Sequence, residues 1–215
     1  MNEEKFWNEE YWGKNLAKKE EKSFDFLEDI WLEKYKDILK KIPKNEVLDL
    51  GCGLGQFTSY FLKKGFNVTS ADIAENALMY VKKNNPKTNC VKLNMKSKLP
   101  FEDNQFELVF ANLSIHYFDD ETTKSLVKEI YRILKPNGYF IGSVNSSKCF
   151  FYIEKEAEEI EPNFYMAEGR PVRLFERTQF DKYFDCFENV QLNEIETTRW
   201  GNKKNMWEFI YKKNM

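Results

Sequence analysis

The sequence contains few of the residues that build disulfide frameworks and metal centres. Its 215 residues include four cysteines and a single histidine. The cysteines lie far apart and form no C-x-x-C pair or other zinc-binding spacing: Cys52, Cys90, Cys149 and Cys186. We therefore expect no metal site, and reduced thiols for at least three of the four cysteines, as in a reducing cytoplasm.

Long apolar runs and an excess of basic residues are also absent. No stretch approaches the roughly 20 apolar residues that a membrane helix needs, and the N-terminus reads MNEEK rather than a basic and then apolar signal peptide. We expect no membrane segment and a cytoplasmic location. Lys and Arg total 33 against 35 Asp and Glu, which argues against a nucleic-acid partner bound by a broad basic surface.

The composition does provide enough apolar material for a packed core. Hydrophobic residues make up 42% of the chain and aromatic residues 16%. These fractions argue against a disordered protein despite 32% charged residues. The length suits one domain, and we predict a single domain over residues 1–215.

Apolar residues recur with helical and strand periods in alternation. From Phe24 to Leu39 they recur at steps of three and four residues and stop at Pro43, which predicts helix within residues 1–45. The further predicted helices are Gln56–Lys64, Glu75–Asn84, Thr122–Leu134 and Thr178–Phe184, with an acidic helix at Glu154–Glu161. The predicted strands are Glu46–Leu50, Asn67–Ala71, Cys90–Leu93, Phe106–Ala111, Tyr139–Val144, Val190–Ile195 and Met206–Tyr211.

This alternation indicates the fold class. Strands separated by helices need crossover connections, which favour a mostly parallel sheet with helices on both faces. The last two strands follow each other directly, and a turn around Gly201 and Asn202 is expected to join them. We therefore predict an α/β protein whose sheet ends in a closing pair of strands.

A glycine-rich turn follows the first predicted strand. Residues 47–56 read VLDLGCGLGQ, so Asp49 precedes three closely spaced glycines. Glycine permits a tight turn and a close approach of the backbone to a ligand. The spacing differs from that of a phosphate-binding loop, and no lysine follows to hold a triphosphate. Asp49 is expected under the turn, where its carboxylate can anchor loop amides or face an ammonium group.

An acid stands at the end of the second predicted strand. Asp72 lies about 20 residues beyond the glycine turn, where a carboxylate can accept hydrogen bonds from both hydroxyls of a ribose. A strand-end acid in solvent is the simpler alternative. The glycine turn upstream favours the ribose interpretation.

Four segments, in this order, resemble motifs of class I S-adenosylmethionine (SAM)-dependent methyltransferases. DLGCGLG at 49–55, followed by Asp72, is similar to the first motifs of that family. NMKSKLPF at 94–101, FELVFANLSIHY at 106–117 and EIYRILKPNGY at 129–139 resemble segments of its type-11 group. The pattern that includes NFYMAEGR at 163–170 adds some likeness to tellurite-resistance-type methyltransferases.

The resemblance implies a fold, a cofactor and a reaction. The fold would be a Rossmann-like, mostly parallel sheet of seven strands with helices on both faces and an antiparallel C-terminal edge pair. The enzyme would move a methyl group from SAM to a small-molecule acceptor and release S-adenosylhomocysteine (SAH). Residues 1–45 would form a helical cap, 46–145 the SAM-binding core, and 146–215 a substrate-covering insert with the closing strands.

The resemblance also assigns residues to the methionine part of SAM. The pocket for this part would be shaped by Asp49, Gly51, Cys52, Gly53 and Gly55.

The adenosine part would contact the next two strand ends. Asp72 would bind the ribose hydroxyls, and Ile73 would pack on the adenine ring. Asn94 would accept a hydrogen bond from the adenine amino group, and the Met95 amide would reach a ring nitrogen. The family usually has Asp where this chain has Asn94, so we expect weaker but not absent adenine binding.

The segment after the fourth predicted strand carries the candidates for catalysis. Asn112 and Leu113 would lie beside the methionine moiety and face the reactive methyl. His116 is a candidate general base, because its unperturbed pKa lies near neutrality. Tyr117 has the same standing. The alternative for His116 is a side chain that only lines the pocket or caps a loop.

Two other segments are candidates for covering the substrate. Tyr11 and Trp12 belong to an aromatic N-terminal stretch whose rings suit a sulfonium by cation–π attraction, or which packs on the core as an amphipathic helix. Tyr165, Arg170 and Arg173 lie between the fifth strand and the last helix. The two arginines would hold an anionic substrate, or else they are surface residues.

Three rival functions remain to be weighed. An NAD-dependent oxidoreductase usually needs G-x-G-x-x-G, whereas Gln56-Phe57-Thr58 follows Gly55 here. DNA amino-methyltransferases commonly carry N/D-P-P-Y/F after the fourth strand, where this chain reads NLSI, and no Pro-Cys pair of a cytosine-C5 enzyme occurs. A SAM-binding protein without catalysis stays an alternative. The sequence does not specify the oligomeric state.

Overall fold

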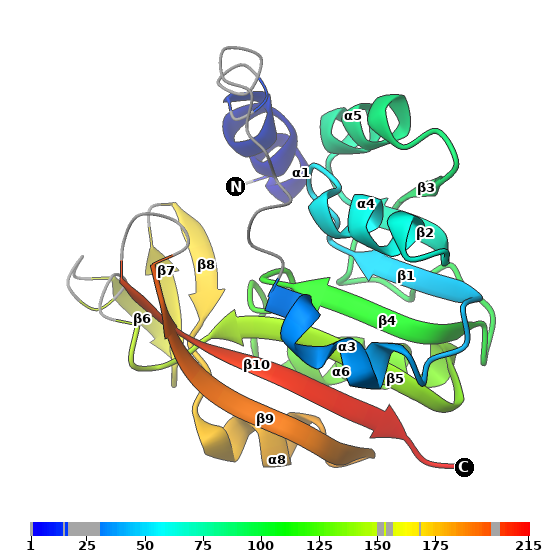
Figure 1. The fold of residues 1–215 in the computed structure, drawn as a ribbon. Helices are drawn as coiled ribbons and strands as arrows, with labels where there is room; N and C mark the ends of the chain where they lie inside the picture. Colours follow the sequence, from blue (N-terminus) through cyan, green and yellow to red (C-terminus); the bar gives the residue numbers. More distant parts are fainter. Residues whose placement is uncertain are drawn as a thin grey trace. The chain divides into compact units, whose positions relative to one another are not determined.

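The fold is described from a computed structural model (Figure 1). The structure describes residues 2–14, 16, 31–149, 153, 157–167, 169–198 and 203–215. Internal contacts divide the chain into two compact units, residues 1–100 and 101–215.

A seven-stranded sheet is the framework of the fold. Its strand order is β3-β2-β1-β4-β5-β10-β9. The pairs β1–β2, β2–β3 and β4–β5 are parallel, whereas β10 runs antiparallel to both β5 and β9. This arrangement confirms the predicted mostly parallel sheet of seven strands with an antiparallel C-terminal pair.

The first unit contains three parallel strands and the helices that connect them. Its elements are α1 (Glu3–Lys5), the π-helix η1 (Phe6–Gly13), the 3-10 helix η2 (Trp31–Tyr35), α3 (Lys36–Leu39), β1 (Glu46–Leu50), α4 (Gln56–Lys63), β2 (Asn67–Asp72), α5 (Glu75–Asn84) and β3 (Asn89–Lys92). Apart from Glu46 and Asp49, the residues of β1 are apolar, which is typical of a strand covered on both faces. Val47, Leu48 and Leu50 are fully buried.

The second unit contains the other four strands of the large sheet. Its elements are β4 (Phe106–Asn112), α6 (Asp120–Ile133), β5 (Leu134–Asn145), β6 (Glu158–Glu161), β7 (Phe164–Ala167), β8 (Arg170–Arg173), α8 (Arg177–Tyr183), β9 (Phe187–Thr197) and β10 (Lys204–Lys213). Aromatic side chains of α8 and β10 pack together in its core. Phe180 and Phe209 are both fully buried, and their ring centroids lie 6.0 Å apart.

The predicted acidic helix at Glu154–Glu161 is wrong over its last four residues. Glu158–Glu161 forms the edge strand β6 of a separate three-stranded sheet, β6-β7-β8, whose pairs are antiparallel. Charged side chains are common on edge strands because they oppose pairing with another chain. Residues 154–156 lie outside the described part of the chain.

The end of α6 also differs from the prediction. The helix ends at Ile133, and Leu134 already pairs with Phe106 as the first residue of β5. Pro136 disfavours helical backbone at the residue before it, which explains the early end. The N-terminal stretch from Phe24 to Ile30 and the turn at Gly201 and Asn202 lie outside the described residues.

Membrane insertion through a helix finds no support in the described part of the chain. None of the helices there is long and apolar enough to cross a bilayer.

Candidate active site

The glycine turn and Asp72 are joined directly in the first unit. Gly51, Gly53 and Gly55 all have positive φ, at 75°, 50° and 76°. The carboxylate of Asp72 is 6% exposed, and its Oδ2 accepts the Gly53 N–H at 2.9 Å. Its Oδ1 accepts the Ala74 N–H at 2.9 Å. Asp72 therefore fixes the turn at the carboxyl end of β2, where parallel α/β sheets bind their ligands.

Asp49 lies buried in β1, just before the turn. Its Oδ2 accepts the Thr58 hydroxyl at 2.7 Å, and the same hydroxyl lies 2.7 Å from Ser70. Burial, opposed by the Thr58 hydrogen bond and reinforced by the charge of Asp72, raises the pKa of Asp49 to about 7. Its described partner is thus a hydroxyl on α4, and with a pKa of about 7 the carboxyl is partly protonated near neutral pH, so that a nearby cation would displace the proton.

The N-terminal π-helix packs on the glycine turn. A Cβ on Gly53 would lie 2.6 Å from the Trp12 ring, so only glycine leaves room for this indole. The helix is held in place by Asn8, whose Oδ1 accepts the Asn76 N–H at 2.8 Å and whose backbone oxygen accepts from the Asn76 side chain. Tyr11 stacks edge-on against Trp12 with 4.8 Å between ring centroids.

The remaining predicted cofactor residues of this unit lie around the ends of β2 and β3. Cys52 is buried and packs with Leu78 and Val81 of α5, whereas Ile73 is half-buried. The Asn94 Oδ1 accepts the Lys96 N–H at 2.9 Å, which forms a local turn. Its amide nitrogen is a donor and the oxygen keeps a second lone pair. The predicted contact of Asn94 with adenine stays a prediction.

These groups of the first unit fit a nucleoside with an aminoacyl tail. The buried carboxylate of Asp72 retains lone pairs beyond the backbone amides that it accepts, as ribose hydroxyls need. Asp49, with a pKa of about 7, would ionise fully beside an ammonium group. SAM carries both chemical groups.

The candidate acceptor site in the second unit begins with the segment that follows β4. Asn112 is the last residue of β4, and its Oδ1 accepts the Ser143 hydroxyl at 2.7 Å. Leu113 has φ of 52°, a conformation that costs energy for a branched side chain. Its N–H is held by the Ser143 carbonyl at 2.9 Å. Strained backbone of this kind is often found at ligand-binding sites.

His116 is buried in this segment and is 1% exposed. Its Nε2 lies 3.3 Å from the Asn145 Nδ2, at the end of β5. Burial, followed by the charges of Arg170 and Lys204, holds its pKa well below the usual range. The imidazole is therefore neutral near pH 7. The Tyr117 ring lies beside it, with 4.3 Å between centroids. The predicted role of His116 as a general base stays a prediction.

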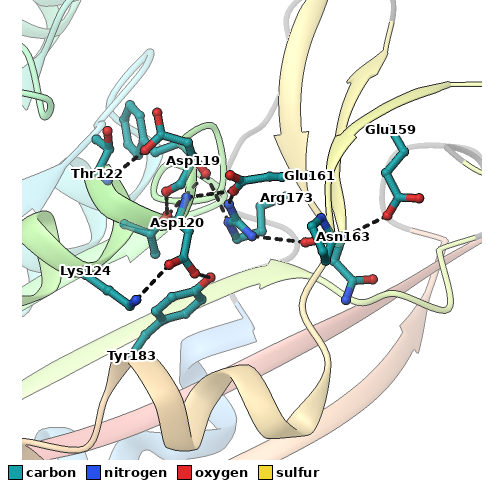
Figure 2. Close-up of polar contacts among 12 residues, drawn as sticks. Asp119, Asp120, Thr122, Lys124, Glu159, Glu161, Asn163, Arg173 and Tyr183 are labelled. Atoms are coloured by element: carbon teal, nitrogen blue, oxygen red, sulfur yellow. Dashed lines mark hydrogen bonds and ion pairs between the residues drawn. The ribbon is translucent and has the colours of Figure 1, made fainter.

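Arg173 is engaged inside the second unit. It is 1% exposed and ion-paired with Glu161, and its Nε donates to the Phe118 carbonyl at 3.1 Å. Figure 2 shows its side chain between Glu161 and the segment that carries Asp119 and Asp120. Glu161 also accepts the Asp120 N–H at 2.7 Å, in the first turn of α6.

These contacts connect the three-stranded sheet to the segment that carries His116. The backbone N–H of Arg173 donates to the His116 carbonyl at 2.7 Å. Tyr183 of α8 donates to Asp120 at 2.6 Å, and Lys124 pairs with the same carboxylate (Figure 2). Arg173 thus has an internal role, and its predicted part in substrate binding stays a prediction.

Tyr165 and Arg170 lie on the same three-stranded sheet. Tyr165 is half-buried in β7 opposite Val172, and burial together with Glu159 raises its pKa. Arg170 begins β8 opposite Ala167 and is half-buried. Its charge contributes to the lowered pKa of His116.

Several residues of these sites were not predicted from the sequence. Thr58 binds Asp49, Asn145 contacts His116, and Asn8 anchors the N-terminal helix. Asn145 was detectable in principle, because it directly follows the predicted strand Tyr139–Val144, at the sheet edge where ligands bind. Thr58 and Asn8 are polar residues within helices and carry no such signal.

Comparison with known proteins agrees with this geometry. Residues 48–142 match the family described as a methyltransferase domain, of the type-11 group. The human protein named arginine-hydroxylase NDUFAF5, mitochondrial, is 37% identical over 127 residues, which are 56% of this chain and 35% of that protein. The chain thus spans about a third of the length of this curated relative.

Solved structures share the fold. A SAM-dependent methyltransferase from Methanosarcina mazei superposes with a TM-score of 0.76 at 22% identity and covers 84% of this chain and 98% of its own. TehB from Haemophilus influenzae superposes with a TM-score of 0.65 at 19% identity and covers 85% and 62%. The sheet, the glycine turn with Asp72 and the matched segment agree with one another: residues 48–142 match the type-11 methyltransferase domain, and the fold is that of SAM-dependent methyltransferases.

Proposed function

We propose that the chain transfers the methyl group of SAM to a small-molecule acceptor. The observation that carries this proposal is the Asp72 carboxylate, buried at the end of β2 and bound to the Gly53 amide of the glycine turn. This pairing joins an acid placed where it would bind a ribose to a turn that permits close approach of a ligand.

Residues of the first unit would hold the cofactor. Asp72 would accept the ribose hydroxyls, and Asp49 would ionise to face the ammonium. Trp12, already against Gly53, would exclude water from the bound tail. SAM itself supplies an electrophilic methyl group on a sulfonium when bound.

Residues of the second unit would orient the acceptor. Methyl transfer is an in-line displacement, so alignment of the acceptor atom with the methyl carbon and sulfur is the main contribution of the protein. The strained backbone at Leu113 and the buried ring of His116 give this unit a fixed surface for that purpose. Single-domain organisation over residues 1–215 and a cytoplasmic location remain part of this proposal.

Cofactor binding is tested with the variant Asp72→Ala. We expect its affinity for SAH, measured by calorimetry, to fall at least about tenfold, since two hydrogen bonds to a charged group are lost. Asp37→Ala is the matched control, because Asp37 is exposed and pairs only with nearby Lys40 among the contacts described. Unchanged affinity in a folded Asp72→Ala protein would remove the ribose assignment.

The acceptor class is tested by transfer of tritiated methyl from SAM into a cell extract. The proposal predicts label in the fraction below about 3 kDa, well under domain size, and none with Asp72→Ala. The name of the human relative raises a protein arginine as a second class of target. Label that stays entirely in the protein fraction would contradict a small-molecule acceptor.

A further inference from the structure

The His116 imidazole has one ring nitrogen that the described residues leave unsatisfied. The ring is 1% exposed, and its Nδ1 is buried with no hydrogen-bond partner among the residues that the structure describes. A buried polar atom without a hydrogen-bond partner destabilises the folded protein. Such an atom, in the segment that follows the carboxyl end of β4, is best explained by a ligand that hydrogen-bonds to it.

The contact on the opposite side of the ring determines whether Nδ1 is a hydrogen-bond donor or acceptor. The Asn145 Nδ2, a donor, lies 3.3 Å from Nε2. With the Asn145 amide oriented as in this structure, Nε2 accepts, and in the neutral ring the proton then resides on Nδ1. His116 consequently presents an N–H donor, and the atom that completes it is an acceptor, such as an oxygen.

One hydrogen bond holds the backbone of His116, and another holds that of its ring neighbour Asn145. The His116 carbonyl accepts the Arg173 N–H of β8 at 2.7 Å, and the Phe175 N–H donates to the Asn145 carbonyl at 2.8 Å. The ring is therefore held between the end of β5 and the three-stranded sheet, and the direction of Nδ1 is set before any ligand arrives.

Two cationic side chains, Arg170 and Lys204, act electrostatically on the ring. Arg170 begins the same strand that holds the His116 carbonyl. Lys204 begins β10, two residues before Met206, which faces Asn145 in the ladder. Both cations act on His116, since they lower its pKa after burial has done so. A positive field next to a buried N–H donor suits a negatively charged oxygen.

We propose that His116 Nδ1–H, with the charges of Arg170 and Lys204, binds an anionic oxygen of the methyl acceptor, a carboxylate or a phosphate. His116 then binds substrate as a hydrogen-bond donor, which replaces the proton-accepting role expected from the sequence. The inference rests on the proposed function, because the acceptor site belongs to the same reaction.

The single histidine of the chain makes a direct test possible. The full chain is prepared with 15N-labelled histidine and saturated with SAH, and the imidazole nitrogens are followed by NMR. The probes are acetate and inorganic phosphate, with acetamide as the neutral counterpart of acetate and chloride as the control for ionic strength. SAH binding is measured by calorimetry on the same sample.

The proposal predicts a neutral ring protonated at Nδ1, whose signal shifts saturably with one of the two anions but not with acetamide or chloride. Saturation by acetate alone identifies a carboxylate, and saturation by phosphate alone identifies a phosphate. In Arg170→Gln the anion affinity falls about tenfold or more, whereas Arg177→Gln, which changes an exposed arginine of α8, leaves it unchanged.

Three results would overturn the proposal: a proton on Nε2, a response to acetamide equal to that to acetate, or no response to either anion. No response to either anion is expected if Nδ1 hydrogen-bonds only to water. If SAH still binds in such a sample, only the anion site is lost. If SAH does not bind, the proposed function fails. The position of the ring proton can still be read from the NMR spectrum, because that reading does not depend on SAH.

Discussion

At the scale of single residues, the raised pKa of Asp49 makes cofactor binding depend on pH. In the free protein this carboxyl, with a pKa of about 7, is protonated in mildly acidic solution. An ammonium group beside it favours the ionised form and lowers that pKa, so binding of SAH releases a proton. We expect the affinity for SAH to rise between about pH 5.5 and pH 7, by at most about tenfold per unit, and then to level off.

Calorimetry in buffers of different ionisation enthalpy measures the released proton. Asp49→Asn cannot ionise and is close in size, so its affinity is expected to change little over this range. A wild-type affinity that is flat from about pH 5.5 to pH 7.5 would mean that Asp49 does not meet the ammonium.

The contact between Gly53 and Trp12 gives a second prediction at this scale. Gly53→Ala places a methyl group 2.6 Å from the indole, at a φ of 50°. We expect the indole to move and the affinity for SAH to fall at least about tenfold, since the N-terminal helix would no longer close on the turn. Removal of the clash in Gly53→Ala/Trp12→Ala is expected to make the two losses less than additive.

Trp12→Ala alone provides the reference for this cycle. Strictly additive losses in calorimetric affinity would show that the two residues act independently on the cofactor.

At the scale of elements, Arg173 fastens the three-stranded sheet to α6 and to the segment that carries His116. Arg173→Leu keeps apolar volume but leaves Glu161 without its cation, so we expect the free energy of unfolding in urea to fall by about 3 kcal/mol. The His116 NMR signals are expected to broaden as their support is lost. Arg177→Leu changes an exposed pair and is expected to have little effect.

A stability loss in Arg173→Leu no larger than that in Arg177→Leu would contradict this structural role. Arg173 would then again be a candidate for substrate binding.

The same elements show what the sequence could predict. The core strands are runs of apolar residues bounded by glycine and proline, and the helix Glu75–Asn84 was predicted with both of its boundaries correct. β6 could not be predicted, because four residues rich in glutamate carry no strand period. Its conformation depends on pairing with β7 and on the contact of Glu161 with Arg173, which are tertiary interactions.

The candidate sites divide in the same way. Asp49, Asp72 and the glycines form a local pattern, and the structure brings Asp72 and Gly53 into contact. The burial of Arg173 and the unsatisfied Nδ1 of His116 depend on residues up to 55 positions away. Patterns over short windows do not contain such contacts.

At the scale of the whole molecule, the central claim is that this chain binds SAM rather than a dinucleotide. The most direct measurement is calorimetric titration of the purified protein with SAH, with NADH as the control. We predict saturable binding of one SAH per chain and no binding of NADH. Binding of NADH alone, or of neither ligand, would contradict the account.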